Sequence, residues 1–139
     1  MVFSICFFIH LSTIYAESNQ KLNYPGNRNK SFVSEDVFYG QLDKKVYKEY
    51  KNAAYSVRKK ILFKEVLDEE FNFRQKTAVG CRSRVVLQDS FIHPYRQVYF
   101  FASFSQNEVD EFHKYIVIDT ETKRELQEGK SYHNCDNPE

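Results

Sequence analysis

The chain has 139 residues, of which 28% are charged and 42% hydrophobic, and this balance excludes a disordered polar tail and a multi-span membrane protein. Twenty Lys and Arg side chains against nineteen Asp and Glu give a net charge of +1, which excludes a globally basic, histone-like nucleic-acid binder. With thirteen Phe, ten Tyr and no Trp, the core of the single domain that this length predicts must consist largely of Phe and Tyr.

The first sixteen residues have the pattern of a secretory signal peptide. An apolar run ends at the small residue Ala16 and is followed by the polar residues 17–20. The run is shorter than the roughly 20 residues that a membrane span needs. We therefore predict a signal peptide over residues 1–16 and a secreted, monomeric domain over residues 17–139 that does not enter membranes. The alternative for residues 1–16 is a buried N-terminal strand or helix.

Secretion affects how the cysteines are interpreted. Cys6 would leave with the signal peptide, and Cys81 and Cys135 would remain as an even pair in an oxidising compartment. A disulfide between them would close a loop of about 55 residues and would contribute about 4 kcal/mol in the chain-entropy model. Two free thiols or an intermolecular bridge are the alternatives.

The first elements of the mature chain are predicted to be an extended arm and one amphipathic helix. Residues 17–31 are polar and include Pro25, and the tripeptide that starts at Asn29 is a glycosylation sequon. The helix is predicted over Ser34–Asn52, because Ser34 is a good N-cap and two acidic residues follow it in the first turn. Apolar residues then recur every four positions from Phe38 to Tyr50.

The second half of the chain has the two-residue period of strands. Residues 53–73 are ambiguous, and we predict a helix or irregular segment followed by a short strand. The later strands are predicted at Arg84–Gln88, Val98–Phe104, Tyr115–Ile118 and Lys130–His133. The run from Val98 is apolar on both faces, as a central strand is. The pattern therefore predicts an α+β fold with one main N-terminal helix packed on a central antiparallel sheet.

Positive charge is concentrated in the first part of the mature chain. Residues 17–100 carry a net charge of +6, whereas residues 101–139 carry −5. Aromatic rings interleaved with cations are typical of surfaces that bind single-stranded nucleic acid. The predicted RNA-binding residues are Arg58, Lys59, Lys60, Lys64, Arg82, Arg84, Tyr55 and Phe63. The alternative is a solvated basic face over a core formed by the same aromatic residues.

The sequence contains no recognisable catalytic motif. His93, His113 and His133 are scattered without the spacing of metal ligands, and neither a phosphate-binding Gly-rich loop nor a Gly-x-Ser-x-Gly elbow occurs. We therefore predict no metal, no cofactor and no enzymatic activity. A nuclease that uses His93 or His113 with an acidic partner is the enzymatic alternative.

A protease inhibitor is the second functional alternative. The segment Gln75–Gly80 is similar to the Gln-x-Val-x-Gly loop of cystatins, and Gly26 precedes the predicted helix as the N-terminal glycine of cystatins does. The spacing is one residue too long, however, and the Pro-Trp of the second cystatin hairpin is absent.

The order of motifs resembles that of the ribonuclease-like secreted effectors of cereal powdery mildew fungi, which are similar to guanyl-specific fungal ribonucleases. The motifs are Tyr24 in the arm, the helix opening Phe32–Val37, the strands at Tyr99–Phe101 and His113–Asp119, and the closing Tyr132–Cys135. The resemblance spans most of the mature chain and implies a microbial ribonuclease-like fold.

The departures from this family imply a lost reaction. Gly26 takes the place of a cysteine that usually bridges to the C-terminal one, so the resemblance leaves Cys135 to pair with Cys81 or to stay free. Phe100 takes the place of the catalytic carboxylate, and Lys114 or Tyr115 that of the arginine. The resemblance therefore implies a pseudo-ribonuclease.

The family also implies a biological role. It predicts a virulence effector that is secreted and then translocated into the cytoplasm of the host plant cell. There the effector binds host RNA, the ribosome or host proteins, and recognition by an intracellular immune receptor would make it an avirulence determinant.

Overall fold

The computed structural model describes residues 23–77 and 91–134. Its elements in chain order are α1 (Glu35–Gln41), β1 (Tyr55–Leu62), the 3-10 helix η1 (Phe63–Glu65), α2 (Val66–Thr77), β2 (Gln97–Gln106), β3 (Asp110–Asp119) and β4 (Glu125–Asn134). The predicted strand Arg84–Gln88 lies outside the described residues.

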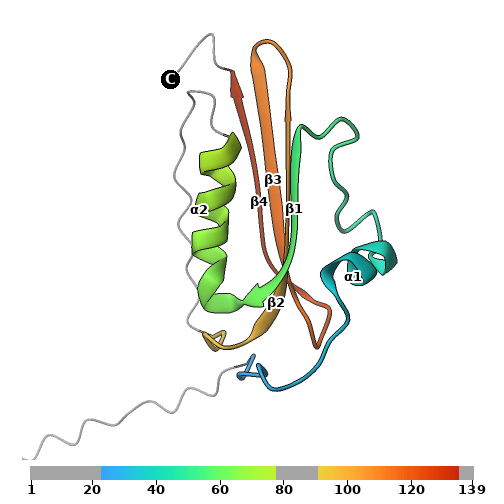
Figure 1. The fold of residues 1–139 in the computed structure, drawn as a ribbon, viewed down its shortest axis with the longest axis vertical. Helices are drawn as coiled ribbons and strands as arrows, with labels where there is room; N and C mark the ends of the chain where they lie inside the picture. The colour runs from blue at the N-terminus through green and yellow to red at the C-terminus, as the bar shows by residue number, and fades with distance from the viewer. Residues whose placement is uncertain (1–22, 78–90, 135–139) are drawn as a thin grey trace, which may run out of the picture.

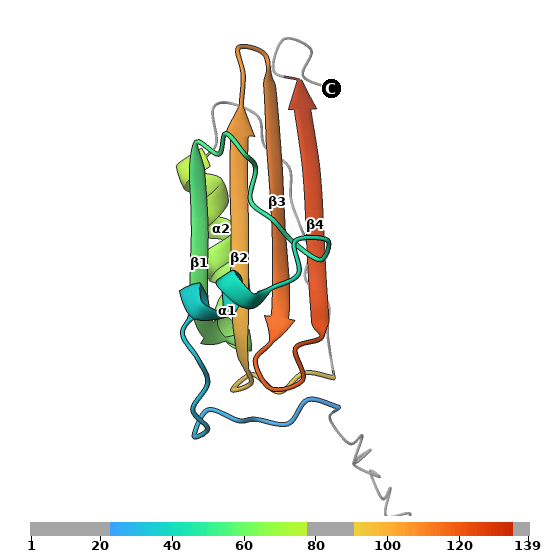
Figure 2. The same ribbon diagram turned by 90° about the vertical axis from the view of Figure 1, so that its right-hand side faces the viewer.

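The four strands form one antiparallel sheet in the order β1-β2-β3-β4. Figure 1 shows the sheet from its edge, with α2 against one face and α1 with the loop that follows it against the other. Figure 2 shows the four strands side by side, with α1 in front and α2 behind. The α+β prediction is therefore confirmed. The prediction of one main N-terminal helix is wrong, because the longer helix is α2, which follows the first strand.

The core lies on both faces of β2. Val98, Phe100, Ala102 and Phe104 pack beneath α2, and Tyr99 and Phe101 pack beneath α1. Every side chain of β2 from Val98 to Phe104 is at most 3% exposed. The prediction of a central strand that is apolar on both faces is confirmed, because burial between two layers removes the need for a polar face.

Helix α1 begins where the sequence predicts, but it ends far earlier than the predicted end at Asn52. The Ser34 hydroxyl accepts a hydrogen bond from the N–H of Val37 at 3.4 Å. The predicted helix to Asn52 is wrong, because the backbone of Leu42 is extended and α1 ends at Gln41. Tyr47 is 6% exposed, with its ring 6.1 Å from that of Phe101, whereas Val46 is 46% exposed. Packing of this segment along the sheet thus overrides the four-residue spacing.

The order predicted for residues 53–73 is also wrong. The strand β1 comes first and the helix α2 second, because β1 pairs along its length with β2. The three consecutive cations at 58–60 hide the two-residue alternation of β1. The end of this region, where the short strand was predicted, is helical: Phe71 is 59% exposed and Phe73 is 3% exposed, and both lie in α2.

Candidate nucleic-acid interface

Strand β1 divides the predicted RNA-binding residues between two faces of the sheet. Side chains alternate along a strand, so Tyr55, Val57 and Lys59 lie on the side of α2, whereas Arg58 and Lys60 lie on the side of α1. The consecutive cations of the sequence therefore do not form one continuous basic patch.

Arg58 is occupied by contacts within the protein. Its guanidinium donates to both carboxylate oxygens of Glu49, at 2.6 and 3.0 Å, and to Asp36 at 3.1 Å. It also lies over the ring of Tyr39, with Cζ 3.8 Å from the centroid. The hydrogen bonds to Glu49 raise the pKa of Arg58, so its charge is held and balanced inside the fold. These contacts tie β1 to α1 and to the loop after it.

The neighbouring lysines are bound in the same way. Lys59 donates to the carboxylate of Glu69 in α2 at 2.7 and 2.8 Å. Lys60 donates to the carbonyl of Phe32 at 2.9 Å. Phe63 is half-buried and packs against the core beneath α2. The three residues therefore make contacts that support the fold in this structure.

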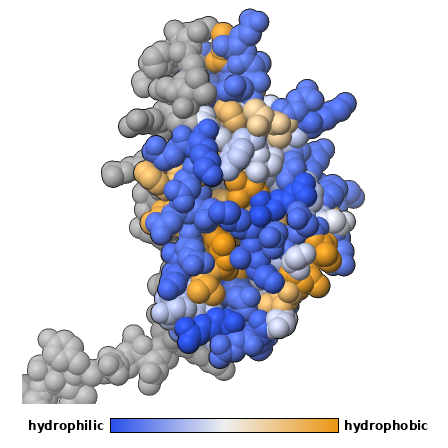
Figure 3. Space-filling view, viewed as in Figure 1, coloured by the Kyte–Doolittle hydropathy of each residue, from blue (hydrophilic) through white to orange (hydrophobic). Residues whose placement is uncertain are grey.

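A groove of about 270 Å³ lies between α2 and β1. We call it the α2–β1 groove. Its lining includes Tyr55, Lys59, Glu69, Phe73 and Lys76. The ring of Tyr55 stacks on that of Phe73 at 5.9 Å, and the Nζ of Lys76 is 3.4 Å from the Tyr55 hydroxyl. Figure 3 shows a broken line of apolar surface between α2 and β1, with hydrophilic surface on both sides. The groove thus combines an aromatic surface with nearby cations.

A second concavity lies beside the N-terminal arm. We call it the arm pocket; it has a volume of about 400 Å³ and is lined by Gly26, Asn27, Arg28, Asn29, Lys30, His93 and Tyr95. The guanidinium carbon of Arg28 is 5.0 Å from the centroid of the Tyr95 ring, and the Nζ of Lys64 is 4.6 Å from it. Among the predicted RNA-binding residues that the structure describes, Lys64 is the one that lies beside this pocket. Arg28 and Tyr95 were not predicted from the sequence.

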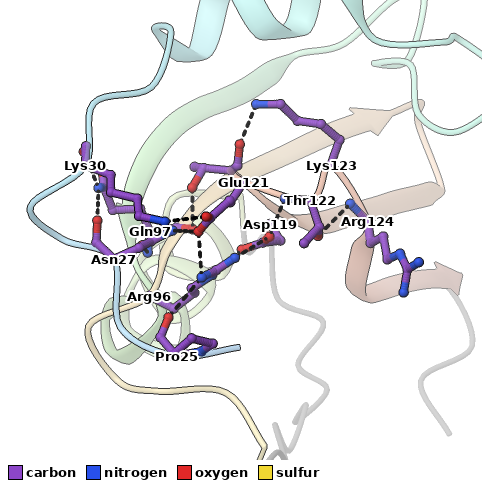
Figure 4. Close-up of polar contacts among 11 residues, drawn as sticks. Pro25, Asn27, Lys30, Arg96, Gln97, Asp119, Glu121, Thr122, Lys123 and Arg124 are labelled. Carbon is purple, nitrogen blue, oxygen red and sulfur yellow. Dashed lines mark hydrogen bonds and ion pairs between the residues drawn. The ribbon is translucent and has the colours of Figure 1, made fainter. Parts of the chain in front are cut away.

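A buried ion pair fixes the arm behind this pocket. Arg96 donates to both carboxylate oxygens of Asp119, at 2.6 and 2.8 Å, and to the carbonyl of Pro25 at 2.9 Å (Figure 4). Gln97 donates from its backbone N–H to the side-chain oxygen of Asn27 at 2.7 Å. Because Arg96 is 3% exposed and Asp119 is fully buried, these bonds are shielded from water. These hydrogen bonds therefore hold residues 25–27 of the arm in a fixed position against the sheet.

Hydrogen bonds favour the charged forms of both Arg96 and Asp119. Burial alone would raise the pKa of Asp119, but hydrogen bonds from Arg96 and Thr122 lower it below its usual value. The hydrogen bond to Asp119 likewise raises the pKa of Arg96.

His113 lies in a closed polar cluster beneath α2. Its Nε2 is 3.0 Å from the hydroxyl of Thr77, and its ring lies edge-on to Phe73. The cavity beside it has a volume of about 10 Å³ and is also lined by Glu70 and Arg74, which form an ion pair. Burial lowers the pKa of His113 to about 4. The cluster brings together a base, an acid and a cation, but the space among them is smaller than a phosphate group.

The residues that the sequence resemblance assigns to catalytic positions lie on different faces of the sheet or in its core. Phe100 is fully buried in the core. Tyr115 shares its face of the sheet, with the two rings stacked at 6.1 Å, whereas Lys114 points to the other face and lies 3.9 Å from the centroid of Tyr50.

Several predicted residues lie outside the described part of the chain, namely Arg82, Arg84, Cys81 and Cys135. Asn29 is exposed, as a glycosylation site must be. Within residues 23–77 and 91–134, no three His, Cys, Asp or Glu side chains are placed to hold a metal ion. Among the helices of this same part, none has the length and apolar character needed to cross a membrane.

No protein-family model, curated protein or solved structure matches the chain.

Proposed function

We propose that the chain is a secreted fungal virulence effector whose ribonuclease-like domain has no nuclease activity and binds single-stranded RNA of the host plant. The observation that carries the RNA-binding part is the α2–β1 groove, which places Tyr55 beside Lys59 and Lys76. The effector role and the ribonuclease-like character of the fold are supported by the resemblance in the sequence.

The charges around the groove favour Lys76 as the principal cation. Lys59 is neutralised by Glu69, whereas Lys76 has no carboxylate partner among the described residues. A phosphate that approaches Tyr55 would meet Lys76 without displacing an ion pair. The ring of Tyr55 provides a face on which a base of any kind can stack, which predicts binding with little sequence preference.

Two buried residues support the absence of catalysis. Phe100 has no group that can accept a proton, and it is fully buried. His113, one of the two bases considered in the enzymatic alternative, is 7% exposed and its Nε2 lies against Thr77. Neither residue reaches a surface where a phosphodiester could bind, and general acid–base catalysis requires hydrogen-bond contact with the substrate.

The inhibitor alternative has less support from the geometry. Gln75 and Lys76 lie in the last turn of α2, which ends at Thr77, and residues 78–80 lie outside the described part. A cystatin-like loop would need these residues at the tip between two strands.

RNA binding is tested by reversing the charge of Lys76. We expect Lys76→Glu to weaken the binding of a fluorescent single-stranded oligonucleotide at least tenfold at low salt, and Tyr55→Ala to weaken it by about the same factor. Lys45→Glu makes the same charge change on the loop after α1, where Lys45 is exposed, and is expected to leave the affinity within about twofold. Equal losses in all three variants would refute the groove as the binding site.

Nuclease activity and host entry need separate measurements. The purified chain is expected to leave the oligonucleotide intact during the binding experiment, and cleavage that disappears in His93→Ala or His113→Ala would overturn the pseudo-ribonuclease. Mass spectrometry of the secreted protein is expected to find Glu17 at its N-terminus.

The role in the host is tested by RNA capture in plant cytoplasm. Capture of host RNA by the chain that is lost in Lys76→Glu and retained in Lys45→Glu would support this role. Equal RNA capture by both variants would contradict it.

A further inference from the structure

The arm pocket contains two cations that share one exposed ring. Tyr95 is 38% exposed, and Arg28 and Lys64 approach its centroid to 5.0 and 4.6 Å from two different segments of the chain. Neither cation has a carboxylate partner among the described residues. A common ring therefore gathers two positive charges that the fold does not use in ion pairs.

The carboxylate that contacts the arm, that of Glu121, is paired with other residues than these two cations. The carboxylate of Glu121 is held by Lys30, by Asn27 at 3.2 Å and by Arg96 at 2.9 Å (Figure 4). These contacts lower the pKa of Glu121 and keep its charge paired. Arg28 and Lys64 thus leave the rim of the pocket positive, and an anionic ligand would not have to compete with Glu121.

The floor of the pocket is preorganised. The N–H of Tyr95 donates to Nδ1 of His93 at 3.0 Å, so the neutral imidazole carries its proton on Nε2 as a further donor. The arm passes so close to His93 that a Cβ on Gly26 would stand 2.9 Å from Nδ1. The backbone N–H of Asn27 donates to the carbonyl of Tyr95 at 3.3 Å. These contacts fix the donors before a ligand arrives, which reduces the entropy that binding costs.

We propose that the arm pocket binds the terminal phosphate of a nucleotide, carried either by a free nucleoside monophosphate or by the 5′ end of an RNA strand. A terminal phosphate monoester carries up to two negative charges near neutral pH, whereas a phosphodiester within the strand carries one. Two unpaired cations therefore favour the end of the strand over its interior. The volume of about 400 Å³ lies within the range of small-molecule sites, about 300 to 1,000 Å³. The RNA form of this inference rests on the proposed function, and the pocket extends it with a second contact.

The experiment compares two oligonucleotides that differ only at the 5′ end. We expect the purified chain to bind the 5′-phosphorylated oligonucleotide about tenfold more tightly than the 5′-hydroxyl one, because charged hydrogen bonds to the phosphate are lost in the second. The double variant Arg28→Ala, Lys64→Ala is expected to lose this preference and to keep the circular dichroism spectrum of the parent chain. The control Lys45→Ala is expected to retain the preference. Titration with adenosine monophosphate and adenosine tests the free nucleotide as the source.

The outcomes separate this inference from the proposed function. Equal binding of the two oligonucleotides, together with no difference between adenosine monophosphate and adenosine, would overturn the inference and leave the α2–β1 groove unaffected. A preference that survives in the double variant would also overturn it. If neither oligonucleotide binds but adenosine monophosphate binds more tightly than adenosine in an Arg28-dependent way, the inference stands and the proposed function fails.

Discussion

Arg96 and Asp119, which are 23 positions apart in the sequence, form a buried bidentate ion pair with N–O distances of 2.6 and 2.8 Å. Arg96 lies just before β2 and Asp119 is the last residue of the neighbouring β3. The same guanidinium donates to the carbonyl of Pro25 and so joins the N-terminal arm to the sheet. One residue pair thus connects the core to the arm pocket.

Removing the arginine is expected to be strongly destabilising. Arg96→Ala leaves the carboxylate of Asp119 buried without its partner, so the free energy of unfolding should fall by about 3 to 5 kcal/mol in urea denaturation. Arg124→Ala is the control, because Arg124 is exposed on the turn that follows β3 and its change should stay within about 0.5 kcal/mol. Similar losses in the two variants would contradict a structural role for the ion pair.

Because His113 is buried, we predict that the free energy of unfolding falls as the pH is lowered. The unfolded chain takes up the proton near the usual pKa of 6.5, whereas the folded chain does so only near 4. Protonation therefore favours the unfolded state between these pH values, and the free energy of unfolding should fall by about 2 to 3 kcal/mol from pH 6.5 to pH 4. Urea denaturation of His113→Phe at a series of pH values is expected to show a smaller fall.

Two glycines provide a matched test of packing. A Cβ on Gly129 would stand 2.9 Å from Cζ of Tyr115 and closer still to Cε1, so Gly129→Ala must displace a buried ring of the core. We expect it to lower the free energy of unfolding by about 1 to 3 kcal/mol. Gly40 lies in α1 with open space around it, so Gly40→Ala is expected to raise that energy by about 0.5 to 1 kcal/mol. Opposite signs in thermal or urea denaturation would confirm the packing of Tyr115 on β4.

The disulfide between Cys81 and Cys135 stays a prediction, because both cysteines lie outside the described residues. Mass spectrometry without reductant should find the two peptides linked. Detection of two free thiols in the secreted protein would refute the bridge.

The sequence predicted those elements whose signals are local. The N-cap at Ser34 and the apolar run from Val98 needed only neighbouring residues, and both lie where they were predicted. The end of α1 was missed because the loop that buries Tyr47 gains its stability from Phe101, 54 positions away. The order of β1 and α2 was missed because β1 is stabilised by pairing with β2 across a long connection, which local periodicity does not contain.

The candidate site was only partly predictable for a similar reason. Three of the predicted cations, Arg58, Lys59 and Lys60, are occupied by partners within the fold. Arg28 lies 67 positions from Tyr95, and only folding brings its guanidinium to that ring. No spacing in the sequence indicates that pair.

The amino-acid sequence by itself determined the composition of the core, the α+β class and the central strand, because hydrophobicity and capping act through near neighbours. The tertiary structure decided which cations are available to a ligand. A cation is available only if no carboxylate lies within a few ångströms, and that depends on segments that meet when the chain packs. Lysine is therefore held in an ion pair within the fold at position 59, whereas at positions 64 and 76 it has no carboxylate partner among the described residues.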